Sequence, residues 1–319
     1  VCSSVGGSAL IEGVMMRNSD KLAVSVRKSD GEIFTEVKTV IPITKKYKFL
    51  GLPFVRGGVS LIDSMIVGIK VLTESAEQVD IYDEEEEESK FEIWLKKRFG
   101  ENYFSYMIYF SVFIALAFSI GLFILLPNFI TGLIPFEKAT SGGSLLANAI
   151  EGLIKISLFL LYIYLVSKNK EIHRVFQYHG AEHKSIHAYE NEEELTVENV
   201  KKHTTIHPRC GTTFMFVVII ISIILFAFTG WHNPLINMLL RLALLPIIAG
   251  ISYEIFKLAA KSDIKLVRLL SMPGLMLQKL TTQEPDDSML EVAIASLNAV
   301  IQEAPVTEQD QPAVSEDNL

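Results

Sequence analysis

The segment that decides the fold is SYMIYFSVFIALAFSIGLFILL, residues 105–126, a run of 22 residues without a charged side chain. An α-helix needs about 20 apolar residues to cross the hydrocarbon core of a bilayer. Three further segments have a similar length and composition: Leu145 to Ser167, Thr212 to Gly230, and Leu235 to about Ile255. The sequence therefore predicts an α-helical multi-pass membrane protein with four transmembrane helices, whose first partner is the lipid bilayer.

The overall composition agrees with a membrane protein and argues against a nucleic-acid-binding one. Half of the 319 residues are apolar, and the mean hydropathy is +0.34. The net charge is −8 and no basic stripe is present, so we expect no nucleic-acid partner. The two cysteines, Cys2 and Cys210, are widely separated and do not make a disulfide framework, which favours a reducing compartment.

The distribution of lysine and arginine predicts the orientation of the four spans. Basic residues precede the first span at 96–98, follow the fourth span at 257–268, and crowd the connection 168–211. The connections 127–144 and 231–234 together hold a single basic residue, Lys138. By the positive-inside rule, we expect both termini and the connection 168–211 to be cytoplasmic.

Residues 1–81 are expected to form a small N-terminal α+β cytoplasmic module. Residues 22–27 and 32–37 alternate apolar and polar side chains on either side of a turn, which predicts a β-hairpin. Residues 53–78 space apolar side chains at three or four residues, as an amphipathic helix does. Its polar face is not especially basic, which favours packing on the hairpin over the alternative, a position on the bilayer surface.

Three other segments complete the expected organisation around the membrane domain, residues 105–258. Residues 82–104 contain an acidic run and are expected to form a linker and a pre-membrane helix. Residues 259–303 are expected to form C-terminal cytoplasmic helices, including an amphipathic one at 287–301. Residues 304–319 are polar and contain proline, and we expect a disordered tail.

Four ionisable residues lie within the predicted spans: Glu151, Lys155, Arg241 and Glu254. Glu151 and Lys155 are four residues apart, so they lie on one helix face and are able to pair. Ionisable groups at membrane depth usually face a bundle interior or a transport pathway.

The connection between the second and third spans holds most of the side chains that are able to bind a metal ion. Six of the seven histidines lie between His173 and His207. On a helix, His179, His183 and His187 would lie along one stripe. The sequence His179-x-x-Glu182-His183 matches the inverted zincin pattern. This pattern predicts two histidine ligands to a divalent transition metal, usually zinc, and Glu182 as a catalytic general base that is not a ligand.

The remaining metal ligand has several candidates. Glu254 lies near the cytoplasmic end of the fourth span, at the distance downstream where the inverted pattern often finds an acidic ligand. His187 and the cluster His203, His207 and Cys210 compete with it. Cys210 also has two other interpretations, a reactive thiol or a small buried residue. The alternative for the whole window is a cytoplasmic helix whose histidines bond carboxylates and lipid phosphates.

Four separated segments carry a resemblance to a known family. They are Gly6 to Arg17, Tyr178 to His187, His207 to Thr212, and Glu284 to Asp287. Together they resemble the YqhQ-like family of bacterial membrane proteins, which have been labelled predicted metal-dependent enzymes. The resemblance extends from about Gly6 to Ile301 and implies a protein of the bacterial inner membrane.

These observations favour a metal-dependent hydrolase that works at the cytoplasmic membrane face. Two other classes stay open. In the first, the protein is a non-catalytic scaffold or regulator, and a structural metal ties the connection 168–211 to the bundle with a closed coordination sphere. In the second, it is a small transporter or metal-handling protein, and a homo-oligomer forms the pathway past the ionisable residues. The substrate class is not apparent from the sequence.

Overall fold

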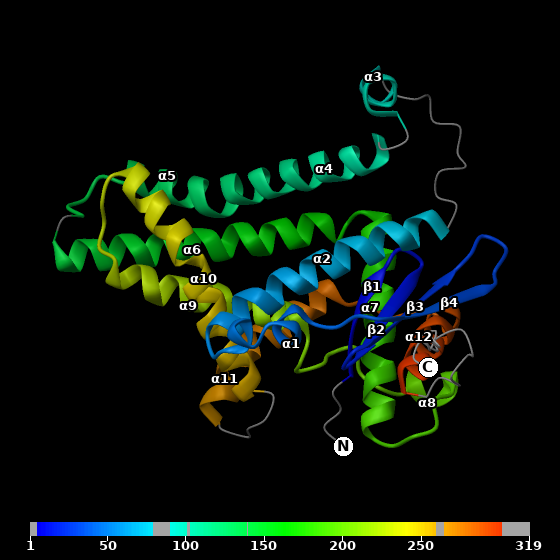
Figure 1. Ribbon diagram of the computed structural model, residues 1–319. Coiled ribbons are helices and arrows are strands. Elements are labelled where there is room, and N and C mark those ends of the chain that lie inside the picture. Colours follow the sequence, from blue (N-terminus) through cyan, green and yellow to red (C-terminus); the bar gives the residue numbers. More distant parts are fainter. Residues whose placement is uncertain (1–4, 79–89, 101–102, 139, 260–264, 302–319) are drawn as a thin grey trace, which may run out of the picture.

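The computed structural model describes residues 5–78, 90–100, 103–138, 140–259 and 265–301. It is mostly helical, with long apolar helices in one part of the molecule and a small sheet with its covering helices in the other (Figure 1). The tail at 304–319 and the acidic run at 82–89 lie outside the described residues.

Four helices within the described part are long and apolar enough to cross a membrane: Phe110–Leu133, Gly142–Val166, Gly211–Phe228 and Pro234–Leu258. The first is built from α4 (Tyr103–Ile120), a π-helical turn η3 (Gly121–Leu125) and α5 (Leu126–Leu133). The others lie in α6 (Ser141–Val166), α9 (Gly211–Phe228) and α10 (Pro234–Ala259). The predicted four-helix membrane class is therefore confirmed.

The N-terminal residues form a four-stranded antiparallel sheet in the order β1-β2-β3-β4. The strands are β1 (Val5–Leu10), β2 (Gly13–Asn18), β3 (Lys21–Arg27) and β4 (Ile33–Thr39). The predicted hairpin is β3 paired with β4, with Val24 opposite Glu36. The first two strands were not expected, because Gly6, Gly7 and Ser8 interrupt the apolar alternation on which strand prediction depends.

Helices cover both faces of the sheet. Val14, Met16 and Ala23 share one core with side chains of α7 (Lys170–Glu190) and α12 (Asp287–Ile301). Leu22, Val24 and Val26 face the other way and pack with Val71 of α2 (Val55–Gln78). Because α12 packs on β2 and β3, the N-terminal strands and this C-terminal helix share one core.

Shorter helices connect these parts. They are α1 (Ile43–Lys46), η1 (Lys48–Gly51), α3 (Lys90–Phe99) and α8 (Val197–Lys201). Helix α11 (Lys265–Thr281) packs along α9 and continues through Pro273. The next residue, Gly274, packs closely on α9, because an added Cβ there would lie 2.8 Å from the Cα atom of Thr213.

The ionisable residues of the spans do not pair as the local spacing suggested. Glu151 binds Arg241 of α10, whose Nε donates to Oε1 at 2.7 Å, and a second bond joins Nη2 to Oε2. Lys155 instead lies over the ring of Phe226, 4.8 Å from its centroid. The planar guanidinium offers two parallel donors to one carboxylate, which an ammonium does not, and this favours the Arg241 partner.

Candidate metal centre

Helix α7 carries the histidine stripe and is fixed at its start by a polar cap. The side chain of Asn169 accepts hydrogen bonds from the backbone N–H groups of Glu171 at 2.8 Å and Ile172 at 3.3 Å. Such a cap satisfies donors that a helix leaves without partners in its first turn. One face of α7 packs Tyr178 and Ala181 into the core beneath the sheet. The stripe of histidines is therefore held on a rigid helix.

Backbone carbonyls fix the first two histidines of the stripe. His179 Nδ1 lies 2.9 Å from the carbonyl oxygen of Thr281, and His183 Nδ1 lies 2.5 Å from that of Thr205. A carbonyl oxygen only accepts, so each Nδ1 must carry the proton. Each Nε2 is then unprotonated and able to accept a bond, which is the arrangement that outer-shell partners give to metal-binding histidines.

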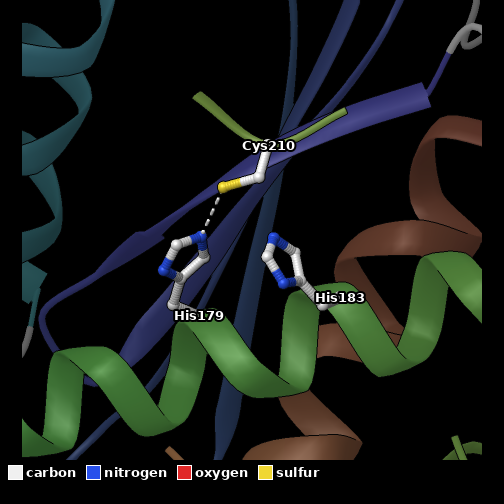
Figure 2. A group of neighbouring side chains, drawn as sticks. All are labelled: His179, His183 and Cys210. Atoms are coloured by element: carbon white, nitrogen blue, oxygen red, sulfur yellow. Dashed lines mark hydrogen bonds between the residues drawn. The ribbon is translucent and has the colours of Figure 1, made fainter. Parts of the chain in front are cut away.

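These two Nε2 lone pairs and the Cys210 sulfur form a group suited to a transition metal. The three ligand atoms of His179, His183 and Cys210 all lie within 4.8 Å of one another. Figure 2 shows both rings rising from α7 towards the Cys210 side chain, with His179 Nε2 3.2 Å from the sulfur. Imidazole nitrogen and thiolate are the usual protein ligands of zinc.

Cys210 is buried and stands at the start of the third span. It is the residue directly before α9, and its sulfur lies 3.3 Å from the hydroxyl of Thr212. Burial raises the pKa of the Cys210 thiol. A divalent cation would remove this effect by stabilising the thiolate, because coordinating thiols are deprotonated.

Glu182 lies beside this group with one carboxylate oxygen unpartnered. The residue is only 4% exposed, and its Oε2 has no hydrogen-bond partner. The backbone N–H of Gly7 donates to the carboxylate, and burial raises the pKa of Glu182 to about 7. A side chain on Gly7 would lie 2.9 Å from the Glu182 Cδ atom, so only glycine allows strand β1 to come this close. A buried acceptor without a donor indicates a site for a further group.

A second group, His187, Glu190 and His207, also has its ligand atoms within 4.8 Å of one another. Its members already have hydrogen-bond partners, however: His187 Nε2 lies 2.9 Å from the carbonyl oxygen of Ile206. The N–H of Arg209 donates to His207 Nδ1 at 3.3 Å, which leaves the proton on Nε2, 3.4 Å from Glu190 Oε2. Glu190 is also paired with the guanidinium of Arg209. A cation here would have to displace the arginine, so the second group is less suited to a metal.

Two predicted ligand candidates lie outside both groups. Glu254 binds Arg56 through both carboxylate oxygens, at 2.7 and 2.6 Å. His203 lies 3.1 Å from Glu193, and its ring stacks on that of His187. Glu190 belongs to the second group although we did not expect it to be a ligand, and its spacing of three residues from His187 was the available signal.

The buried side chain of Gln278 helps to hold the loop from His203 to Cys210 over α7. The Gln278 side chain accepts from the N–H of His207 and donates to its carbonyl oxygen, both at 2.8 Å. It also donates to Thr213 at 2.9 Å. Gln278 thus fixes the loop between two groups of candidate ligands, and nothing in its sequence context suggested this role.

We expect Gln278→Leu to weaken metal binding roughly 10–100-fold, the usual effect of losing an outer-shell partner. The leucine would leave the N–H and carbonyl of His207 without partners and free the loop that carries Cys210. Competition with a zinc chelator measures the change. Lys279→Leu, an exposed neighbour on the same helix, is the matched control and should bind as the wild type does. Equal affinities for the two variants would contradict the role of Gln278.

A cavity reaches the strand that contacts Glu182. It has a volume of about 680 Å³, and its lining includes Gly6, Gly7 and Gly211. A smaller, mostly apolar pocket of about 240 Å³ lies between α2, α9 and α10 and shares Ser64 and Gly211 with it. The cavity thus reaches Gly7 of strand β1, while Glu182 itself is buried behind that strand.

Comparison with known proteins assigns the chain to a family. A family described as "Protein of unknown function (DUF1385)" matches residues 52–303. The chain belongs to the DUF1385 family. This DUF1385 chain is also 36% identical over 312 residues to "Uncharacterized protein YqhQ" from Bacillus subtilis (strain 168), covering 96% of this chain and 95% of that protein. No solved structure is significantly similar to it. The resemblance noted from the sequence is confirmed.

Proposed function

We propose that this DUF1385 member is a metal-dependent hydrolase of the bacterial inner membrane, active at the cytoplasmic face. Its metal, a zinc ion in this proposal, is held by His179, His183 and Cys210. The observation that carries the proposal is the buried Oε2 atom of Glu182, which has no hydrogen-bond partner among the described residues and lies beside three candidate ligands whose ligand atoms are within 4.8 Å of one another.

The donor set fits a catalytic rather than a closed structural site. Structural zinc sites usually have four protein ligands, whereas catalytic sites keep three and leave one position open. The group offers three among the described residues. A scaffold with a purely structural metal would require a fourth protein ligand.

The chemistry that a bound zinc ion supplies is Lewis acidity, which activates water for attack on a carbonyl or phosphoryl centre. Glu182 accepts the proton of the attacking water and passes it to the leaving group. Gly7 holds the Glu182 carboxylate in place through its backbone N–H. The carbonyls of Thr281 and Thr205 keep His179 and His183 in the tautomer that can bind metal.

A transport function receives less support from the same structure. It requires the ionisable groups of the spans to line a common pathway. Arg241 and Glu151 instead bind each other in the bundle interior, and Glu254 binds Arg56.

Replacing Glu182 with glutamine tests the hydrolase proposal. Glu182→Gln is expected to keep the wild-type metal content, because Glu182 is not a ligand, and to lose at least about a hundredfold in turnover, the lower end of what a general base contributes. Metal is measured by elemental mass spectrometry of detergent-purified protein. Turnover is measured with p-nitrophenyl acetate, p-nitrophenyl phosphate and fluorescein-labelled casein.

Glu171→Gln is the matched control, because it makes the same chemical change at an exposed position in the first turn of α7. It should retain both metal and turnover. Hydrolysis that persists in Glu182→Gln, or a wild-type protein that loads with metal but hydrolyses none of the three probes, would overturn the assignment.

A further inference from the structure

Large apolar side chains are exposed along the chain from Ile41 to Ile66. Phe49 is 71% exposed, Ile41 61% and Phe54 59%. Further exposed side chains in this segment are Tyr47, Leu52, Val55, Leu61, Ile62, Met65 and Ile66. Single exposed apolar residues are ordinary, but a cluster of this size in one segment marks an interaction surface.

The segment adjoins the surface of a membrane-spanning helix. Gly57 of α2 packs on α10 so closely that an added Cβ would lie 2.9 Å from the Cα atom of Gly250. A Cβ on Gly250 would in turn lie 2.3 Å from the carbonyl oxygen of Phe54. Gly250 belongs to the fourth candidate span. Close glycine contacts of this kind are how helices associate within membranes.

An ion pair locates this contact at one end of the bundle. Arg56, the second residue of α2, binds Glu254 near the end of α10. The packed body formed by the sheet, α7 and α12 is attached at the same end, because α7 follows the second span and the third span begins after Cys210. The exposed segment therefore lies where the membrane bundle meets that body, as Figure 1 shows for α1 and α2.

Basic and aromatic residues alternate at the start of the segment, and α10 beside it exposes apolar side chains of its own. Lys45, Lys46 and Lys48 flank Tyr47 and Phe49. Such mixtures are typical of elements that lie in the lipid headgroup region, where the lysine ammonium reaches phosphate while the aromatic ring stays in the apolar layer. Ile247 and Leu258 of α10 are 52% and 62% exposed, so the apolar surface is continuous with that of the span.

The second half of α2 has a different environment. Val71 is buried against Leu22, Val24 and Val26, on the face of the sheet opposite to α7 and α12. Glu74 pairs with Lys38 of β4 at 2.7 Å. One helix thus joins the sheet at its C-terminal end and α10 at its N-terminal end. The N-terminal end packs on α10 along one side only, and its large apolar side chains on the other sides stay exposed.

We propose that residues 41–66 lie on the bilayer as an interfacial segment, with their apolar side chains at the boundary between phospholipid headgroups and acyl chains. The occupant of the exposed surface is phospholipid, because the surface continues the lipid-facing side of α10 and carries lysines that suit headgroup phosphates. The segment is a fifth membrane-contacting element that does not span the bilayer, and it places the apolar pocket between α2, α9 and α10 at the membrane surface.

Photocrosslinking in proteoliposomes tests this assignment. The photoreactive amino acid p-benzoylphenylalanine is placed at Phe49, and the full-length protein is reconstituted in phosphatidylethanolamine and phosphatidylglycerol. Phe113, an exposed residue of α4 within the first span, is the positive reference. Val37, a 45% exposed apolar residue of β4, is the matched control outside the segment. Mass spectrometry of the irradiated protein identifies the adducts.

Lipid adducts at Phe49 are expected at a yield similar to that at Phe113 and at least roughly tenfold above that at Val37, because only the first two sites are buried in the acyl boundary. A lipid adduct at Phe113 without one at Phe49 would overturn the proposal. A crosslink from Phe49 to a second copy of the chain, with no lipid adduct, would overturn it in favour of a self-association surface. The lipid adducts do not depend on hydrolysis, so this experiment tests the interfacial segment independently of the proposed function.

Discussion

Replacing His183 with alanine is expected to abolish stoichiometric metal binding, from about one ion per chain in the wild type. The substitution removes a ligand whose Nδ1 is fixed by the Thr205 carbonyl and whose Nε2 faces Cys210. Loss of a direct ligand should exceed the roughly 10–100-fold penalty of losing an outer-shell partner. Elemental mass spectrometry of detergent-purified protein, after reloading with zinc, measures the change.

His203→Ala is the matched control for this result. It removes the same side chain from the same segment of the chain, but His203 binds Glu193 and belongs to neither ligand group. It should therefore keep the metal. A third variant, His207→Ala, separates the two groups, because among the candidate ligands His207 is a member of the second group only. Metal that is lost in His207→Ala but retained in His183→Ala would move the site to His187, Glu190 and His207.

Replacing Arg241 with methionine is expected to lower the free energy of unfolding by about 3–5 kcal/mol, as when one partner of a buried ion pair is removed. Arg241 is 1% exposed and Glu151 2%, so the remaining carboxylate would have no access to solvent. Asn128, whose Nδ2 donates to Glu151 Oε2 at 3.5 Å, would remain beside it, but a neutral amide does not compensate the charge. Chemical unfolding in detergent micelles, followed by circular dichroism, measures the loss.

The double variant Glu151→Leu with Arg241→Met provides the control. Replacing both partners with apolar side chains removes the uncompensated charge, and such replacements are often neutral or stabilising. We expect the double variant to recover most of the stability that the single variant loses. A single variant as stable as the wild type would show that the pair does not hold the second and fourth spans together.

The membrane class followed from local composition because a spanning helix satisfies its own backbone hydrogen bonds and needs no particular neighbour. Helix α12 was predicted at 287–301 for the same reason, since its backbone hydrogen bonds also lie within the helix. The β3–β4 hairpin was predictable because both strands and the turn between them are contiguous in sequence. Strands β1 and β2 could not be recognised in this way. Gly6 and Gly7 lack the side chains that mark a strand, and at Gly7 a side chain would collide with Glu182 and with the carbonyl oxygen of Met15.

Some of the candidate ligands could also be predicted from local sequence, and others could not. Helical periodicity alone aligned His179 and His183, and the position of Glu182 between them defined its expected role. The third ligand could not be chosen from the sequence. Glu254 had a suitable distance downstream, but Arg56 binds it, and the loop held by Gln278 brings Cys210 to the histidines instead.

The sequence by itself determined the four apolar spans, the histidine stripe and the family. Only the tertiary structure decided that Cys210 completes the first ligand group and that Arg209 neutralises Glu190 in the second. Periodicity along one helix is a property of neighbouring residues, whereas a ligand set depends on distances between segments far apart in the chain. The partner of a carboxylate likewise depends on tertiary structure, because folding decides which cationic side chains come within a few ångströms of it.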